Sequence, residues 1–279
     1  MRVVSLHPDV LVATSAIWQT TCVVVRGGVA EEGDVPAGTA PDGPVRVIAG
    51  PAHAGETFVI DSPILPDELD ALPALVEQAG FPAPSGLLAT HGDWDHLLGR
   101  LAFPELALGC AESTAARMGA SPGEAQRELR AFDEEHFVER PRPLSLGAVQ
   151  PLPAPGSCGI GARELDLHPA PGHTGDGIAI AIPWAGALLV GDYLSTVELP
   201  VLGSAGAVEA YANTLARLRP LVERATHVIP GHGHVLDSAQ ALTLLEEDLA
   251  YVRDVGPSSA TRLRRSSRSA RPPRSARPR

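Results

Sequence analysis

The sequence predicts a single α/β domain, because short β-prone runs fill its first third and then alternate with helical segments. Apolar residues make up 44% of the chain, which excludes broad disorder. A length of 279 residues allows a substantial core, and no linker is rich enough to divide the body into two domains. We therefore assign residues 1–254 to one domain and expect residues 255–279, which are rich in Ser, Arg and Pro, to be a disordered tail.

The expected strands are short apolar runs separated by Gly, Pro or Asp. They are residues 10–13, 22–25, 45–49, 57–60, 86–90, 164–168, 177–182, 187–190 and 226–229. The expected helices place apolar residues on one face at three- and four-residue spacing. They are residues 66–80, a charged segment within 111–140, residues 207–222 and a last helix from Ser238, with Asp237 as its N-cap. Residues 35–44 should form a solvated loop, and residues 141–159 a Pro-rich connection.

The charge is divided unevenly along the chain. All 22 basic residues are Arg; the body carries 14 of them against 33 acidic residues, and the tail holds the other eight with no acid. A body this acidic argues against nucleic-acid binding, which needs a basic face. For the tail, a solvated and dispensable terminus is expected rather than a contact with an anionic partner. It lacks the periodic apolar residues of an amphipathic membrane helix.

The N-terminal segment and the cysteines restrict the location and the chemistry. Residues 1–16 contain one Arg and are interrupted by His7, Pro8 and Asp9, which makes a poor signal peptide. No apolar run reaches the 18 residues of a membrane span. We expect a cytoplasmic protein with a small-molecule substrate and no membrane partner. The three cysteines are far apart and form no C-x-x-C pair, so any metal must be held by histidine and carboxylate.

The strongest functional signal is the run THGDWDH at residues 90–96, directly after an expected strand. It offers four potential metal ligands, namely His91, Asp93, Asp95 and His96. In a loop, side chains at odd and even positions can converge on one point, whereas a continued strand would send them to opposite faces. The alternative is a polar surface turn, but the same design recurs elsewhere in the chain.

Three further strand ends carry a His or Asp next to Gly, which permits a sharp turn and a close approach. These residues are His173 in PGHTG, Asp192 in GD and His232 in PGHGH. His234, two residues further on, is an alternative to His232 as a ligand or could contact substrate. Taken together, four such strand ends predict one metal centre.

These motifs resemble those of the metallo-β-lactamase superfamily, whose signature is His-x-His-x-Asp-His followed by Gly-His-Thr, Gly-Asp and Pro-Gly-His segments. The order and approximate spacing match from residues 57–61 (TFVID) through His232, and cover most of residues 10–250. The resemblance implies a four-layer αββα sandwich with the metal site at one edge of two facing sheets. It also implies two divalent ions.

By this resemblance, each ion has its own set of ligands. The first is held by His91, Asp93 and His173, the second by Asp95, His96 and His232, and Asp192 bridges both. Asp93 stands where the family has its second His. A carboxylate can still bind zinc, the expected metal, while oxygen ligands also make iron or manganese suitable. The alternative is that Asp93 is not a ligand but orients His91.

The resemblance and the residues together predict a hydrolase that uses a metal-activated water on an ester, thioester, lactone or amide. Asp95 is the expected catalytic residue, because it could hold the water and relay its proton. A phosphodiesterase of the same fold is a less favoured alternative. The resemblance also extends to persulfide dioxygenases, in which His91, His173 and Asp192 would hold a single iron, and to non-catalytic binding relatives.

Other residues of these types are given ordinary roles or left open. Trp18 and Trp94 could line a pocket, although burial in the core is the commoner role of tryptophan. The remaining histidines lie outside the repeated context and are expected to be structural or exposed: His7, His53, His136, His168 and His227. Neither the substrate nor the oligomeric state can be derived from the sequence.

Overall fold

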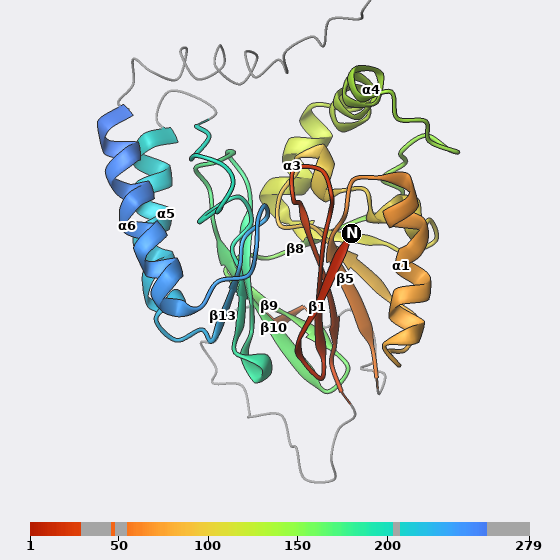
Figure 1. Cartoon of the computed structure of the whole chain (residues 1–279), viewed down its shortest axis with the longest axis horizontal. Helices are drawn as coiled ribbons and strands as arrows, with labels where there is room; N and C mark the ends of the chain where they lie inside the picture. The colour runs from red at the N-terminus through yellow and green to blue at the C-terminus, as the bar shows by residue number, and fades with distance from the viewer. Residues whose placement is uncertain (29–45, 48–54, 203–206, 256–279) are drawn as a thin grey trace, which may run out of the picture.

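Two β-sheets lie face to face at the centre of the computed structural model, and helices cover both outer sides (Figure 1). The structure describes residues 1–28, 46–47, 55–202 and 207–255. This is the αββα sandwich that the sequence motifs imply.

The first sheet has seven strands in the order β1-β2-β3-β5-β6-β7-β8. Their bounds are Arg2–His7 (β1), Val10–Thr14 (β2), Thr21–Arg26 (β3), Thr57–Asp61 (β5), Gly86–Leu88 (β6), Leu108–Ala111 (β7) and Val149–Leu152 (β8). The pairs from β1 to β5 are antiparallel, whereas β5, β6, β7 and β8 are parallel. The parallel strands therefore end at one edge of the sheet, where the loops after β5 and β6 begin.

The second sheet has six strands in the order β13-β12-β11-β10-β9-β4. Their bounds are Arg46–Val47 (β4), Gly156–Ile160 (β9), Arg163–Pro169 (β10), Ile178–Ile182 (β11), Ala187–Leu189 (β12) and His227–Ile229 (β13). Strands β12 and β13 are parallel, and β10 pairs antiparallel with β11. The loops after β12 and β13 consequently leave the same edge.

Two groups of helices cover the sheets (Figure 1). Those on the side of the first sheet are α1 (Pro66–Gln78), α2 (Gly99–Ala102), α3 (Glu112–Ala120) and α4 (Glu124–His136), and those on the side of the second are α5 (Ala207–Val222) and α6 (Ser238–Val255). Two short 3-10 helices occupy Trp94–His96 and Pro183–Ala185.

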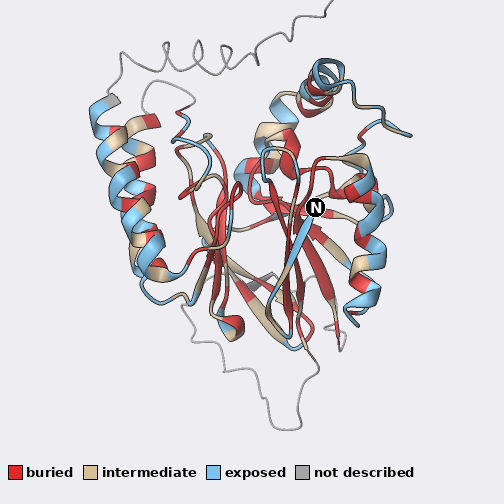
Figure 2. Cartoon of the chain, viewed as in Figure 1, coloured by how far each residue is buried: buried red, intermediate tan, exposed pale blue. Residues whose placement is uncertain are grey.

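Three hydrophobic cores fill the spaces between the four layers, and Figure 2 shows that both sheets consist largely of buried residues. Side chains alternate along a strand, so successive residues belong to different cores. In β2, Val10 and Val12 pack between the sheets, whereas Leu11 and Ala13 face the core under α1. A strand buried on both faces reads as a continuous apolar run, which is how residues 10–13 appear in the sequence.

Most of the predicted elements are present, and the differences have local causes. The Pro-rich connection at 141–159 contains β8 and β9; Pro151 is accommodated because β8 is an edge strand. The charged segment within 111–140 is two helices, separated at Gly123, whose φ is +77°. Strands β1 and β7 were not predicted.

Several other expectations can be compared with the structure. Asp237 caps α6, since its Oδ1 accepts a hydrogen bond from the Gln240 backbone N–H at 2.8 Å. Among the described residues, no helix combines the length and apolar character needed to cross a membrane. The expected loop at 35–44, most of the strand expected at 45–49, and residues 256–279 of the tail lie outside the described residues.

Candidate metal centre

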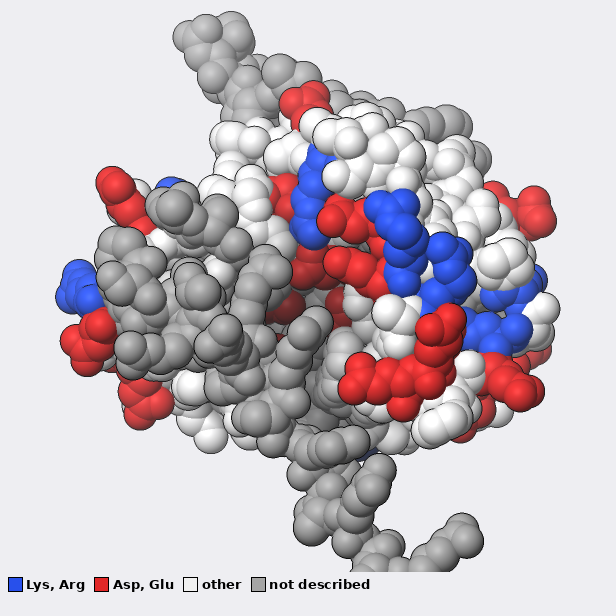
Figure 3. Space-filling view, turned by 90° about the horizontal axis from the view of Figure 1, so that it is seen from above, with Lys and Arg blue, Asp and Glu red and all other residues white. Residues whose placement is uncertain are grey.

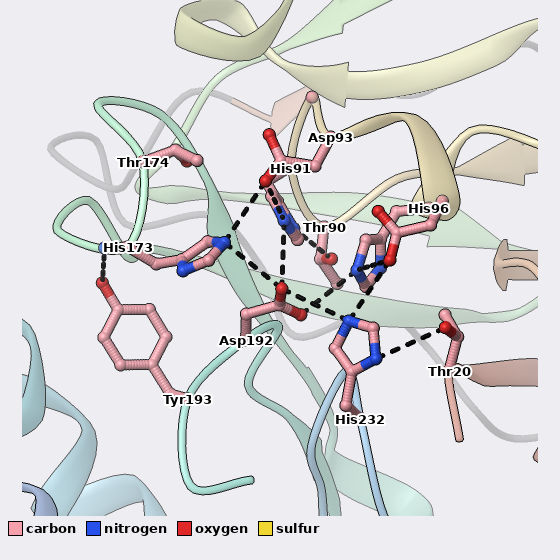
Figure 4. A network of polar contacts seen from close by, with 12 residues as sticks. Thr20, Thr90, His91, Asp93, His96, His173, Thr174, Asp192, Tyr193 and His232 are labelled. Atoms are coloured by element: carbon pink, nitrogen blue, oxygen red, sulfur yellow. Dashed lines mark hydrogen bonds and ion pairs between the residues drawn. The ribbon is translucent and has the colours of Figure 1, made fainter. Parts of the chain in front are cut away.

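The two sheets meet at the edge where the motif loops emerge. The backbone N–H of Ile178, in β11, donates to the carbonyl of Thr90 at 2.8 Å, and that of Thr21, in β3, donates to the carbonyl of Gly231 at 2.7 Å. Each bond joins a loop or strand of one sheet to the other sheet. All seven predicted ligands lie at this junction, and Figure 4 shows His91, His96, His173 and His232 around Asp192.

Asp192 lies at the middle of the cluster (Figure 4). Its Oδ2 is 3.6 Å from Nε2 of His91, 3.2 Å from Nε2 of His173 and 3.4 Å from Nε2 of His232. Its Oδ1 is 3.1 Å from Nε2 of His96. One carboxylate thus faces four imidazoles, as a bridging ligand must.

Among the described residues, ligand atoms form three groups of the kind that could hold an ion, and two of these groups have no residue in common. His91, His173 and Asp192 form one, and Asp95, His96 and His232 form the other; within each group the ligand atoms lie within 4.8 Å of one another. Asp95 Oδ2 is 3.3 Å from Nε2 of His232. These two groups match the partition that the family signature implies, except that Asp93 is in neither of them; a third group, Asp192, Glu198 and His232, shares ligands with both.

The polar atoms at the centre face one another at ion-pair distances but form few hydrogen bonds. Nε2 of His91, Nε2 of His96 and Oδ1 of Asp192 are buried and have no hydrogen-bond partner within the described chain. Leaving a buried polar group unpaired costs about 1–3 kcal/mol. Several such atoms that face one another fit a divalent cation, which imidazole nitrogen and carboxylate oxygen bind well.

The structure also fixes which nitrogen of two histidines faces inward. Asp61 Oδ2 lies 3.0 Å from Nδ1 of His96. Nδ1 of His232 is 3.0 Å from the backbone carbonyl oxygen of Trp18, to which it donates when protonated. A proton held on Nδ1 leaves Nε2 free as a ligand, the arrangement expected of a metal-binding histidine.

Asp61 further organises the first motif through Thr90. Its two oxygens accept from the backbone N–H and the hydroxyl of Thr90, both at 2.8 Å, and the Thr90 hydroxyl is 3.1 Å from Nδ1 of His91. Asp61 is itself buried and has a φ of +56°, unusual for a residue other than glycine. One carboxylate therefore positions two of the candidate ligands.

Asp93 faces the metal-binding side of two histidines. Its Oδ2 is 3.6 Å from Nε2 of His91 and 3.3 Å from Nε2 of His173, while Nδ1 of His91 is contacted by Thr90. Its other oxygen accepts from the Arg117 guanidinium at 2.6 Å. A carboxylate that merely oriented His91 would contact Nδ1, so this geometry favours Asp93 as a ligand.

Arg117 connects three segments around the first motif. Its Nη1 pairs with buried Asp176 at 2.9 Å, and Asp176 in turn accepts from the backbone N–H of Gly92 at 3.0 Å. Burial would raise the pKa of Asp176, but hydrogen bonds from Thr114 and Arg117 lower it overall. Both carboxylates beside Arg117 are thus held in the charged form, and its guanidinium is engaged on both sides.

Electrostatic coupling within the cluster is strong without metal. Burial would raise the pKa of Asp192, but the four surrounding histidines outweigh burial and hold it well below its ordinary range. Burial would likewise lower the pKa of His232, yet Asp192 and Asp95 raise it to about 11. Metal binding would replace this coupling, because a histidine must give up the proton on the nitrogen that binds the metal.

Glycine permits the close approach of the last motif. A Cβ on Gly231 would lie 2.1 Å from Oδ1 of Asp192, so no other residue fits between His232 and the central carboxylate. His234 is exposed and points elsewhere, with Nδ1 3.0 Å from the Thr196 hydroxyl. Of the two histidines in this motif, only His232 faces the cluster.

A cavity of about 570 Å³ opens beside the cluster, and Trp18 and Trp94 both line it. Figure 3 shows acidic side chains inside this hollow. His136, expected to be structural or exposed, also lines the cavity and stacks on Phe132 with ring centroids 4.2 Å apart. Burial, followed by Asp93 and Glu124, raises the pKa of Glu128 in the cavity wall.

Comparison with known proteins agrees with this geometry. The model of the metallo-beta-lactamase superfamily matches residues 47–234, about two thirds of the chain. The chain belongs to the metallo-β-lactamase superfamily. This superfamily assignment confirms the resemblance drawn from the motifs, and no curated protein matches the chain.

Solved structures of the metallo-β-lactamase fold cover most of the chain. A family protein from Thermus thermophilus is 18% identical, with a TM-score of 0.62 over 90% of this chain and 81% of its own. A metallo-β-lactamase from Pontibacter korlensis is 16% identical, with a TM-score of 0.57 over 90% of this chain and 98% of its own. A β-lactamase domain protein from Burkholderia ambifaria is 16% identical, with a TM-score of 0.59 over 95% and 75%. Identities this low establish the fold alone.

Sequence reasoning overlooked several residues that organise the centre. Asp61 entered only as part of the family match. It is the last residue of the buried strand β5, so it lies at a strand end, as the predicted ligands do. Arg117 and Asp176 carried no signal of their own, because their partners lie 24 to 84 residues away along the chain. The cavity wall on α4 lies in the charged segment within 111–140, for which the sequence predicted helical structure.

Proposed function

We propose that this metallo-β-lactamase superfamily member is a metal-dependent hydrolase of ester, thioester, lactone or amide bonds. The observation that carries the proposal is the convergence of side chains from four strand ends at the floor of an open cavity, where six of the seven form two metal-binding groups and Asp93 lies beside His91 and His173. The set is His91, Asp93, Asp95, His96, His173, Asp192 and His232. Two divalent ions fit it, with zinc expected, and iron or manganese compatible with Asp93.

Metal ions held by these residues would make a water molecule acidic enough to act as the nucleophile near neutral pH and would polarise the substrate's carbonyl group. Asp95 lies at the floor of the cavity, where its carboxylate can accept the proton of the nucleophile and pass it to the leaving group. The reaction adds water across the acyl bond: hydroxyl joins the acyl carbon, and the bond to oxygen, sulfur or nitrogen breaks. Ser62 fixes the backbone of Asp95, since its hydroxyl donates to the Asp95 carbonyl at 3.1 Å.

The second ligand group distinguishes this proposal from the oxidoreductase alternative. A mononuclear iron site needs only His91, His173 and Asp192, and would leave the Asp95, His96 and His232 group without a role. The buried Nε2 of His96, which faces Asp95 and Asp192 without forming a hydrogen bond, supports a second ion there. Bound iron with thiol-dependent oxygen uptake would contradict the hydrolase assignment.

A matched pair of histidine variants tests the proposal. His232→Ala should lose metal and hydrolysis of generic ester, thioester and lactone substrates, because its Nε2 faces the cluster. His234→Ala, only two residues away but directed toward Thr196, should keep both. Hydrolysis by the wild-type protein that survives equally in His232→Ala would reject the proposed centre.

A further inference from the structure

The cavity beside the metal centre has an acidic wall on α4. Glu128, Ala131, Phe132 and Glu135 line the cavity, and their spacing places them on one face of this helix. Neither Glu128 nor Glu135 forms an ion pair with another described residue. Arg127 and Arg130 lie on the same helix but do not line the cavity.

An aromatic surface adjoins these carboxylates. Trp18 packs edge-on against Trp94 and Phe132, with ring centroids 5.5 and 5.0 Å apart, and Phe132 stacks on His136. Trp18 is nevertheless 42% exposed, and its φ of +54° is a left-handed conformation that costs energy in a tryptophan. Rings next to carboxylates are the surface that binds organic cations.

The described lining of the cavity contains no free Arg that could form an ion pair with these carboxylates. Arg117 is the one Arg among its described lining residues, and its guanidinium is bound by Asp93 and Asp176. Two divalent ions and a hydroxide would balance Asp93, Asp95 and Asp192, while Arg117 balances Asp176. Glu128 and Glu135, together with Glu198, which also lines the cavity, remain as negative charge without an Arg partner.

The floor of the same cavity indicates where a ligand reacts. Asp192 lines the cavity with a side chain that is only 9% exposed, and its Oδ1 has no hydrogen-bond partner in the described chain. A substrate whose acyl group reaches this floor places its remaining part between α4 and Trp18. That part therefore meets both the carboxylates and the rings.

We propose that the cavity selects acyl substrates that carry a compact organic cation, such as an ammonium group, close to the hydrolysed bond. This inference rests on the proposed hydrolase function and names its substrate class. The cation occupies the space between Trp18 and the two glutamates, while the acyl carbon faces the metal centre. Anionic substrates are repelled, because the described lining contains no free Arg that could form an ion pair with them.

Isosteric substrates isolate the effect of charge. Acetylcholine and 3,3-dimethylbutyl acetate have the same acyl group and nearly the same shape, but only the first is charged. At pH 8, where an ordinary histidine is neutral, kcat/KM of the metal-loaded protein should be about tenfold higher for the cationic ester, a ratio within the range of cation–π and charge contacts. A monoester of succinate, which is anionic, should be hydrolysed more slowly than either.

Substitutions on α4 test whether the cavity wall is responsible. The double variant Glu128→Gln/Glu135→Gln should lower the cationic-to-neutral ratio at least threefold. Glu134→Gln removes one charge from an exposed position of the same helix that does not line the cavity, and should leave the ratio unchanged. Trp18→Leu should also reduce the ratio, because it removes the exposed ring.

The outcomes separate this inference from the proposed function. Metal-dependent hydrolysis with equal kcat/KM for the two esters would overturn the cation preference and leave the hydrolase proposal intact. If no ester is hydrolysed, titration of tryptophan fluorescence with choline and with 3,3-dimethylbutanol decides the preference. Tighter binding of choline, lost in the double glutamine variant, supports the cation site, and equal binding overturns it.

Discussion

Asp61→Asn is expected to weaken metal binding without removing any ligand. The Asp61 carboxylate accepts two hydrogen bonds from Thr90 and lies 3.0 Å from Nδ1 of His96. Asparagine is nearly isosteric but replaces one oxygen with an amide donor. If the amide faces His96, it favours the tautomer with the proton on Nε2, which cannot bind metal; if it faces the backbone N–H of Thr90, two donors are opposed.

The size of this effect follows from the burial of Asp61 and from its partners. Loss of a carboxylate partner behind a metal-binding histidine typically costs 10–100-fold in metal affinity, and at 1.36 kcal/mol per decade this is roughly 1.4–2.7 kcal/mol. The Asp61 side chain is only 4% exposed, so solvent cannot replace it. We therefore expect the upper part of this range for the second ion, with a smaller effect on the first through Thr90 and His91.

Competition with a chromophoric chelator measures both dissociation constants, and urea unfolding of the metal-free variant separates a folding defect from a binding defect. Asp70→Asn, an exposed carboxylate on α1, is the matched control and should bind metal as the wild type does. A folded Asp61→Asn protein with wild-type affinity for both ions would refute the tautomer argument.

Three further predictions concern the same centre. Asp93→Ala should lower the metal content from about two ions per chain to about one by elemental analysis, because Oδ2 of Asp93 faces the first ligand group; an unchanged content would mean that Asp93 is not a ligand. Arg117→Gln should cost about 2 kcal/mol in urea unfolding, since Asp176 is buried but Arg117 is partly exposed, and a loss below about 0.5 kcal/mol, typical of a surface change, would show that the bridge is weak. In the metal-free protein the pKa of His232 is raised to about 11, so the charged His232 stabilises the fold fully below pH 6.5, and this stabilisation is lost as the pH rises toward 11. The melting temperature should therefore be lower at pH 9 than at pH 7. Equal melting temperatures would contradict the coupling to Asp192.

The ligand set could be predicted because the candidate metal-binding residues lie in loops directly after strands. Each candidate ligand lies just after the end of a strand, and parallel neighbours such as β12 and β13 end at one edge of the sheet, which brings His232 and Asp192 together. The αββα fold is confirmed, whereas the reaction and the metal roles stay proposals. Asp61 obeys the same rule and could have been included on this ground alone.

The remaining features depend on contacts that no local pattern encodes. Arg117 is an ordinary helical Arg until folding places it between Asp93 and Asp176, which are 24 and 59 residues away from it. Trp18 lies in the β2–β3 loop and has a left-handed backbone conformation. The backbone carbonyl of Trp18 contacts His232, which is more than 200 residues later in the chain. Strand β9, with glycines at 156 and 159, lacks the apolar run that marks other strands and is fixed by pairing with β10.

The central claim is that a pair of cations unites the seven side chains, and metal content measured together with activity tests it most directly. We predict about two ions per chain in the purified protein, loss of hydrolysis as a chelator removes them, and recovery when zinc, iron or manganese is returned. Full turnover by protein that contains no detectable metal would contradict the claim.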